Sequence, residues 1–201
     1  GEATEGVVDE AIRHSITKMA HVHFTSAEPY RRKVIQMGEQ PKMVHNFGAL
    51  GLDNIASLTP ISRTDLEENL GLALTSPILL VTYHPLTLEY NGAKAVDNLL
   101  DALAQEKDVL IVFTGANADA LGQEINTKFV KFCAERNGKA VHVFSLGVQR
   151  YLSLMQISEA VIGNSSSGLL EAPYLGVPTV NIGDRQRGRL TAPAVINCGE
   201  T

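Results

Sequence analysis

The sequence predicts an α/β protein with a doubly wound, Rossmann-like parallel sheet. From residue 77 onward, short continuous apolar runs alternate with helix-length amphipathic segments, and small polar residues follow several of the runs. Strands that are buried on both faces appear as uninterrupted apolar runs, because helices cover both sides of a parallel sheet. With 44% hydrophobic and 19% charged residues among 201, the chain can bury a sizeable core.

The strands and helices of this sheet are expected to alternate. The predicted strands cover residues 78–83, 109–113, 140–144, 160–163 and 179–182, with a strand-like run at 194–197. The predicted helices cover residues 93–106, 122–136, 149–156 and 167–175. Such alternation is typical of parallel strands joined by crossover helices, so residues 61–201 are expected to form one Rossmann-like domain.

Residues 1–60 are expected to be the remnant of another α/β domain together with an interdomain connection. Val8, Ile12 and Ile16 recur at helical spacing within residues 7–20. Ser26 is expected to cap a second helix, which ends before Gly38. The remaining segments are expected to be strands over 22–25 and 44–47, then a loop with a short helix over 50–75.

Charge and composition exclude several classes of protein. The formal net charge of −5 argues against non-specific binding to nucleic acid or to an anionic membrane, because no basic surplus can neutralise phosphates. No apolar run reaches the length of a membrane span, and no signal peptide opens the chain. Cys133 and Cys198 lack the spacing of a disulfide framework or a zinc site, which fits a reducing cytoplasm. Both ends of the sequence are expected to be cut rather than native.

A turn of small residues at 163–168, Gly-Asn-Ser-Ser-Ser-Gly, follows one of the predicted strands. Open parallel sheets bind their ligands beyond the carboxyl ends of the strands. A small-residue turn that opens a helix presents backbone N–H groups to a phosphate, and the hydroxyls of Ser165 and Ser166 would add donors. The alternative is that Ser167 simply caps the following helix.

Three other polar side chains lie near predicted strand ends. Glu171 is suited to accept hydrogen bonds from sugar hydroxyls, such as those of a ribose, or it is a solvated helix residue. Arg185 can bind a diphosphate bidentately, or it can pair with Asp184 at the surface. His84 is a candidate acid/base or phosphate donor, because an imidazole gives and takes protons near neutral pH; the alternative is a structural role.

A second group of polar residues stands near the start of the chain. Asp9, Arg13 and Thr17 share one face of the first predicted helix, and His21 and His23 are expected to point the same way from the following strand. A carboxylate, a guanidinium and imidazoles together can move protons and stabilise anions. No metal is expected, because the two histidines have no third ligand at a suitable spacing.

Five motifs occur in an order that identifies a family. They are the stretches at 1–14, 48–55, 83–85, 163–168 and 181–189, which include Asp-Glu-Ala-Ile-Arg-His, Tyr-His-Pro and Asn-Ile-Gly-Asp-Arg-Gln. Together they resemble the hydrolysing UDP-N-acetylglucosamine 2-epimerases of sialic-acid biosynthesis. The resemblance covers nearly the whole chain, and the combination is specific although each motif alone is short.

The resemblance implies a two-domain GT-B-like fold with the active site between the domains, of which residues 61–201 are the C-terminal, nucleotide-binding half. It implies that UDP-GlcNAc and water become ManNAc and UDP, through elimination to a glycal and rehydration, without a cofactor or a metal. It also implies a homo-oligomer, either a dimer or a tetramer. UDP-GlcNAc or UDP is the expected ligand.

The resemblance also assigns site residues by motif position. Asp9 and Arg13 match catalytic positions, with His21 and His23 in support, and His84 contacts the diphosphate or acts as an acid/base. The implied UDP contacts are Ser165, Ser166 and Arg185 at the diphosphate, Glu171 at the ribose, and Asn117 and the Leu146 backbone at the nucleotide.

One departure and several alternatives accompany the resemblance. A preceding strand and a catalytic carboxylate of the family would lie upstream of Gly1, so residues 1–201 alone are expected to be inactive. A close alternative is hydrolysis of UDP-2,4-diacetamido-bacillosamine, and another is a non-hydrolysing 2-epimerase. A GT-B glycosyltransferase and a non-catalytic UDP-binding module are alternatives of a different class.

Overall fold

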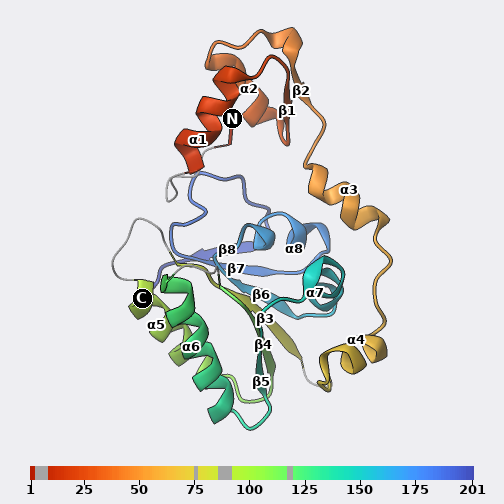
Figure 1. The fold of residues 1–201 in the computed structure, drawn as a ribbon, viewed down its shortest axis with the longest axis vertical. Coiled ribbons are helices and arrows are strands. Elements are labelled where there is room, and N and C mark those ends of the chain that lie inside the picture. Colours follow the sequence, from red (N-terminus) through yellow and green to blue (C-terminus); the bar gives the residue numbers. More distant parts are fainter. Residues whose placement is uncertain (3–8, 75–76, 86–91, 117–119) are drawn as a thin grey trace.

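The structure is a computed structural model that describes residues 1–2, 9–74, 77–85, 92–116 and 120–201. A six-stranded sheet with the strand order β5-β4-β3-β6-β7-β8 dominates it (Figure 1), and every neighbouring pair of these strands is parallel. The predicted α/β fold class is therefore confirmed. The strands are β3 (Ile78–Thr82), β4 (Leu110–Thr114), β5 (Ala140–Val143), β6 (Ala160–Gly163), β7 (Thr179–Ile182) and β8 (Val195–Cys198).

Helices cover both faces of this sheet. One face packs against α5 (Gly92–Gln105) and α6 (Ala120–Glu135), and the other against α7 (Gly147–Gln156) and α8 (Glu171–Tyr174). Because β3 lies between β4 and β6, the direction of winding reverses at β3. This reversal creates a switch point, and the crevice beyond the carboxyl ends of β3 and β6 is where such sheets bind ligands.

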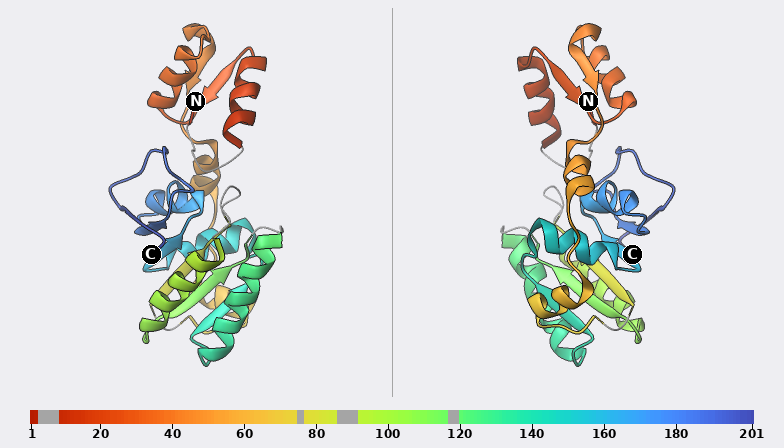
Figure 2. Two further views of the ribbon diagram at one scale, coloured as in Figure 1. Left: turned by 90° about the vertical axis from the view of Figure 1, so that its left-hand side faces the viewer. Right: turned by 90° about the vertical axis from the view of Figure 1, so that its right-hand side faces the viewer.

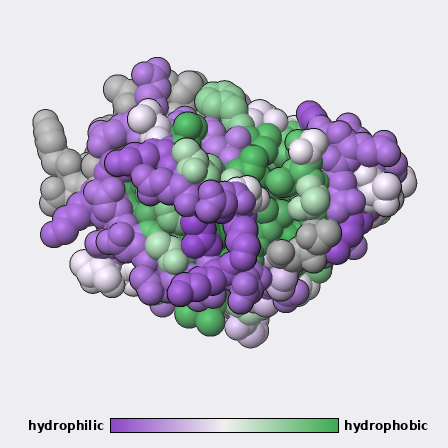
Figure 3. Space-filling view, turned by 90° about the horizontal axis from the view of Figure 1, so that it is seen from below, coloured by the Kyte–Doolittle hydropathy of each residue, from purple (hydrophilic) through white to green (hydrophobic). Residues whose placement is uncertain are grey.

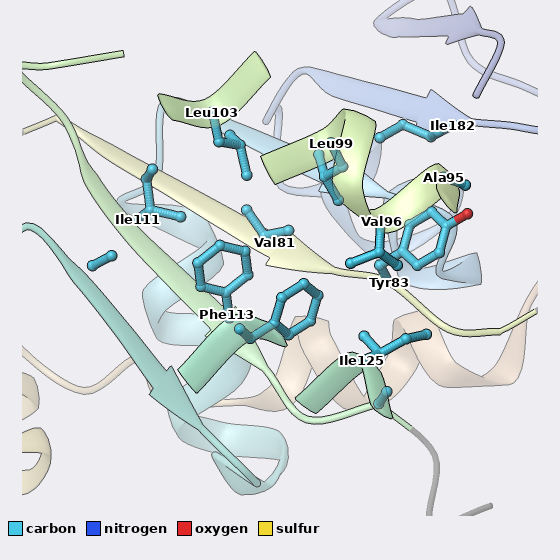
Figure 4. Packing of buried hydrophobic residues seen from close by; sticks show 13 residues of the cluster. Val81, Tyr83, Ala95, Val96, Leu99, Leu103, Ile111, Phe113, Ile125 and Ile182 are labelled. Atoms are coloured by element: carbon cyan, nitrogen blue, oxygen red, sulfur yellow. The ribbon is translucent and has the colours of Figure 1, made fainter. Parts of the chain in front are cut away.

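The two faces have separate hydrophobic cores, set by alternation along the strands. Val81 and Phe113 point to the side of α5 and α6 (Figure 4). On this side Phe113 stacks on Phe129, with ring centroids 4.4 Å apart. Leu80 and Val112 belong to the opposite core, with side chains from α7 and α8. These buried apolar faces fix the register of the strands and thereby the positions of their carboxyl ends.

The N-terminal residues form a smaller unit at one end of the molecule (Figures 1 and 2). A two-stranded parallel sheet, β1 (His23–Thr25) with β2 (Val44–Asn46), packs with α1 (Asp9–Met19), α2 (Glu28–Gln36) and the 3-10 turn η1 (Pro41–Met43). Within the described part of residues 1–46, the buried hydrophobic side chains are those of Val34 and Val44. This unit therefore has little core of its own.

Two helices connect the unit to the large sheet, where a loop with one short helix was predicted. They are α3 (Leu50–Ser57) and α4 (Arg63–Leu70). The helix α4 has a complete set of end signals, because Ser62 caps it by accepting the N–H of Asp65 and Gly71 ends it at a φ of +60°. Leu66 of α4 is fully buried in the core beside α7 and α8, so α4 packs as part of the large domain.

Two other helix predictions were wrong in detail. The N-cap of α2 is Ala27 rather than Ser26, and it makes no side-chain capping bond. The predicted helix over 167–175 is divided into a 3-10 turn, η2 (Ser166–Gly168), and the short α8. Pro173 explains the division, because proline is tolerated in the first turn of a helix but not in its interior.

The surface of the large domain is mixed in character. Viewed from the end farthest from the N-terminal unit, apolar patches lie between polar side chains (Figure 3). An apolar cavity of about 550 Å³ lies beside α5 and is lined by side chains that include Leu99, Ile162 and Val180. Across the described ranges, the helices are too short or too polar to span a bilayer.

Candidate functional site

Asn164 organises the crevice at the switch point. It follows β6, and its side chain is fully buried. Its Oδ1 accepts the backbone N–H of His84 at 2.7 Å, and its Nδ2 donates to the carbonyl oxygen of His84 at 2.8 Å. These two bonds join the carboxyl ends of β3 and β6. Gly163 permits the close approach, because a Cβ at this position would collide with the carbonyl oxygen of Thr82.

The loop after β7 is attached to the same residue. The carbonyl oxygen of Asn164 accepts a hydrogen bond from Arg185 Nη1 at 3.1 Å and another from Gln186 Nε2 at 2.7 Å. Asp184 pairs with Arg187 at 3.7 Å. The structure thus places Arg185 beside the Ser-rich turn and His84, as expected from the strand ends. No role was predicted for Asn164 within the motif at 163–168, although an Asn after a glycine at a strand end was the available signal.

The Ser-rich turn is ordered by its own hydroxyls. Ser165 is the N-cap of η2, and its side chain accepts the N–H of Ser167. The alternative in which Ser167 is the capping residue is therefore wrong. Ser167 Oγ donates to Ser165 Oγ at 3.0 Å and lies 2.6 Å from the hydroxyl of Tyr151 on α7. Ser165, Ser166 and Ser167 are all half-buried, so a ligand can still reach this turn.

Glu171 begins α8, which follows this turn after Leu169 and Leu170. The residue is half-buried, but its Oε2 is enclosed and has no hydrogen-bond partner among the described residues. The negative charge of Glu171 contributes to a raised pKa of Tyr151, after the larger effect of burial of the phenol. An enclosed carboxylate oxygen without a donor is costly, and ligand hydroxyls are suitable donors for it.

The remaining nucleotide positions are described in part. Leu146 is buried and is the N-cap of α7. Its carbonyl oxygen accepts a hydrogen bond from Arg150 Nε at 2.8 Å. Asn117 lies outside the described residues.

A cluster of opposite charges links α1 to the loop after β7. Arg13 donates to Glu2 through Nη1 and to Glu10 through Nη2, both at 2.9 Å. Glu2 also pairs with Arg189 at 3.3 Å. Asp9 is the first residue of α1, but its side chain lies outside the described ones. Glu2 was not singled out from the sequence, since its partners are distant along the chain.

The two predicted histidines do not share one environment. His21 precedes β1 and is exposed. His23 is buried on β1, with Nε2 3.2 Å from Glu39 Oε2. A hydrogen bond from Lys18 to Glu39 lowers the pKa of this carboxyl. The expectation that both histidines point the same way from one strand is therefore not met, because His21 precedes β1 and is exposed whereas His23 is buried on β1.

A polar cavity of about 590 Å³ adjoins the loop that carries Arg185. Its lining includes Asn181, Gln186, Arg187, Arg189 and Glu200. Asn181 Oδ1 and Gln186 Oε1 are buried there without a hydrogen-bond partner in the described structure. The cavity leaves room for a ligand beside the crevice. No group of three metal-ligating side chains occurs within the described ranges.

Comparison with known proteins places the chain in a family. The family model "UDP-N-acetylglucosamine 2-epimerase" matches residues 1–201. The chain is 44% identical over 198 residues to the "GDP/UDP-N,N'-diacetylbacillosamine 2-epimerase (hydrolyzing)" of Campylobacter jejuni. The aligned residues make up 98% of this chain and 52% of that relative. It is 42% identical over 199 residues to "Polysialic acid biosynthesis protein P7" of Escherichia coli. Here the aligned residues make up 98% of this chain and 50% of that relative.

The fold is shared with solved structures. A UDP-GlcNAc 2-epimerase from Methanocaldococcus jannaschii, in complex with UDP-GlcNAc and UDP, superposes with a TM-score of 0.69 at 16% identity. The match covers 95% of this chain and 54% of that one. The chain therefore has the fold of about half of a GT-B-like protein, and it spans about half the length of the curated relatives. It belongs to the UDP-N-acetylglucosamine 2-epimerase family.

Proposed function

We propose that the protein is a hydrolysing UDP-N-acetylhexosamine 2-epimerase, which converts UDP-GlcNAc and water into ManNAc and UDP for nonulosonic (sialic) acid synthesis. The observation that carries the proposal is the crevice ordered by Asn164. It brings His84, Arg185 and the Ser-rich turn together at the switch point of a parallel sheet. The relative named as a hydrolyzing epimerase supports the hydrolytic reaction.

A second substrate has equal support. The relative at 44% identity is named for N,N'-diacetylbacillosamine, whereas the relative at 42% identity is named for polysialic acid biosynthesis. The first name specifies an N-acetylated sugar carried on a nucleotide, and the second names a pathway. We therefore propose UDP-GlcNAc and UDP-2,4-diacetamido-bacillosamine as the two candidate substrates.

In the proposed binding mode, the large domain holds UDP. Arg185 and the hydroxyls of Ser165 and Ser166 contact the diphosphate, because a guanidinium and hydroxyl donors match its charged oxygens. Glu171 accepts the ribose hydroxyls through its half-buried carboxylate. Asn117 and the Leu146 backbone complete the nucleotide contacts.

The proposed chemistry uses residues from both regions of the molecule. A base removes the proton at C2 while the bond from C1 to UDP breaks, which gives the glycal and free UDP. Water then adds its oxygen at C1, and a proton returns to C2 on the opposite face. Asp9 is proposed to transfer protons, with Arg13 beside it, and His84 acts on the diphosphate leaving group or as an acid/base. His21 and His23 remain supporting candidates.

We retain the division into a remnant over residues 1–60 and a nucleotide-binding domain over residues 61–201. We also propose that residues 1–201 alone do not turn over, and that the full-length protein is a homo-oligomer. Release of free ManNAc by the 201-residue chain would contradict the proposed inactivity. Light scattering of the full-length protein tests the proposed homo-oligomer.

Product analysis by NMR of the full-length protein tests the reaction. With no acceptor sugar present, the expected products are UDP and the free 2-epimeric sugar, with solvent deuterium at C2 in D2O. The substrate with the higher kcat/KM identifies the sugar. A UDP-linked product would indicate a non-hydrolysing epimerase, and dependence on an acceptor would indicate a glycosyltransferase. Tight UDP binding without turnover would indicate a non-catalytic UDP-binding module.

A further inference from the structure

A series of hydrogen-bonded hydroxyl groups runs from α7 to the Ser-rich turn. The Tyr151 hydroxyl lies 2.6 Å from Ser167 Oγ, and Ser167 Oγ donates to Ser165 Oγ at 3.0 Å. Thr82, at the carboxyl end of β3, lies 3.5 Å from the same Tyr151 hydroxyl. The series therefore ties the turn to a helix and to the strand at the switch point.

Counting protons fixes the direction of these bonds. A hydroxyl has one proton to donate. Ser167 gives its proton to Ser165, so in the short contact with Tyr151 the phenol must be the donor. The order of donation is then Tyr151 to Ser167 to Ser165.

The Ser165 hydroxyl, at the end of this series of hydrogen bonds, can only donate to a further partner. Ser165 Oγ accepts the hydroxyl proton of Ser167 and also its backbone N–H at 3.4 Å. Both lone pairs of this oxygen are thus engaged within the turn. What Ser165 can still offer a ligand is its proton.

We propose that Tyr151 is a positioning residue, which acts through Ser167 to fix the Ser165 hydroxyl as a donor to a phosphate oxygen of the bound nucleotide. This inference rests on the proposed function, since the nucleotide comes from it. A phosphate oxygen is the matching partner because it only accepts hydrogen bonds, whereas a sugar hydroxyl can turn to either role. Arg185, bonded to the carbonyl of the neighbouring Asn164, brings positive charge to the same place.

The surroundings of Tyr151 keep it a donor. Burial raises the pKa of its phenol, and the charge of Glu171 raises it further, so the hydroxyl keeps its proton at neutral pH. Neither Tyr151 nor Ser167 needs to touch the ligand for this role. We call the donation from Tyr151 through Ser167 to Ser165 the relay. Its first two residues act without contacting the nucleotide.

The test compares UDP with uridine as probes of the full-length protein, by calorimetry. Tyr151→Phe keeps the ring and removes the donor, and it is expected to weaken UDP binding about 3- to 10-fold, as for one lost hydrogen bond. Uridine affinity should not change, because uridine carries no phosphate. Ser167→Ala, which interrupts the relay one step later, should give the same pattern. Tyr174→Phe, at an exposed tyrosine of α8, is the matched control and should bind both probes like the wild type.

A double-mutant cycle separates positioning from general damage. If Tyr151 acts through Ser165, then Tyr151→Phe should have no further effect in a Ser165→Ala background. Additive losses, or equal losses for UDP and uridine, would overturn the relay. If Ser165→Ala weakens UDP binding while Tyr151→Phe and Ser167→Ala do not, the relay fails and the proposed function stands. If the wild type does not bind UDP, both fail.

Discussion

The two ends of this molecule obtain their order in different ways. In the large domain, Phe113 and Phe129 are completely buried and stack on each other. In the N-terminal unit, the aromatic side chains Phe24 and Phe47 are 65% and 70% exposed, and they stack with His45 on the surface. The large domain therefore completes its own core, whereas the N-terminal unit presents its apolar side chains to its surroundings.

The same contrast extends to the polar groups of the candidate site. The crevice is held by buried hydrogen bonds of Asn164, an uncharged side chain. Arg13 is held by ion pairs with Glu2 and Glu10, whose side chains are partly exposed to solvent. Buried hydrogen bonds are insensitive to salt, whereas exposed ion pairs are screened by it. The proposed UDP site and His84 therefore lie among buried hydrogen bonds, whereas Arg13 lies in a cluster of partly exposed ion pairs.

The largest expected effect concerns the core. Phe113→Ala should lower the free energy of unfolding of the 201-residue chain by about 3–5 kcal/mol, because it leaves a cavity beside Phe129. Phe24→Ala, the matched change in the N-terminal unit, should alter it by less than about 0.5 kcal/mol. Urea denaturation measures both. A comparable loss from Phe24→Ala would contradict this difference between the two regions, since it would mean that another surface covers the Phe24 ring.

The next effect concerns Asn164. Asn164→Ala should cost about 2–4 kcal/mol of stability, because two backbone groups of His84 lose buried partners. Asn69→Ala, on the exposed side of α4, removes one local hydrogen bond and serves as the control, with little change expected. Denaturant midpoints at low and high salt would show the same loss. A loss that disappears in salt would contradict the account of an uncharged, buried junction.

A smaller effect is expected at the nucleotide. Arg185→Ala should weaken UDP binding by about 1–3 kcal/mol, because it removes a charge-assisted contact to the diphosphate. Arg32→Ala is the control, since Arg32 is an exposed arginine of α2 that pairs with Glu28. Calorimetry with UDP measures both variants. Unchanged affinity after loss of Arg185 would remove this residue from the proposed diphosphate site.

The two regions also differ in how far the sequence predicts them. The strands β6 and β7 have the predicted limits. For β6 the reason is the continuous apolar run that is typical of a strand buried on both faces. The roles of Asn164 and Glu2 escaped prediction for a physical reason. Asn164 acts on His84, 80 residues earlier, and Glu2 meets Arg189 near the other end of the chain. Local periodicity contains no information on such contacts.

Side-chain hydroxyls show the same limit at short range. The turn at 163–168 was predicted as a phosphate site from its composition, but the direction of its hydrogen bonds depends on Tyr151, which comes from α7. The choice of Ser165 rather than Ser167 as the cap also depends on geometry, because either serine could cap a helix by its chemistry. Residue type thus indicates the site, and packing assigns the donors.

The smallest expected effect tests the ion pairs that connect the two regions. Glu2→Gln removes the charge shared by Arg13 and Arg189, and it should lower stability by at most about 1 kcal/mol, since the three side chains are partly solvated. The loss should shrink between about 0.05 and 1 M NaCl, where the Debye length falls from over 10 Å to about 3 Å. Glu28→Gln, within α2, removes ion pairs that stay inside the N-terminal unit and is the matched control. A loss of stability as large as that of Asn164→Ala, or one that persists in high salt, would contradict this account. It would mean that the ion pairs of Glu2 stabilise the protein as strongly as the buried hydrogen bonds of Asn164.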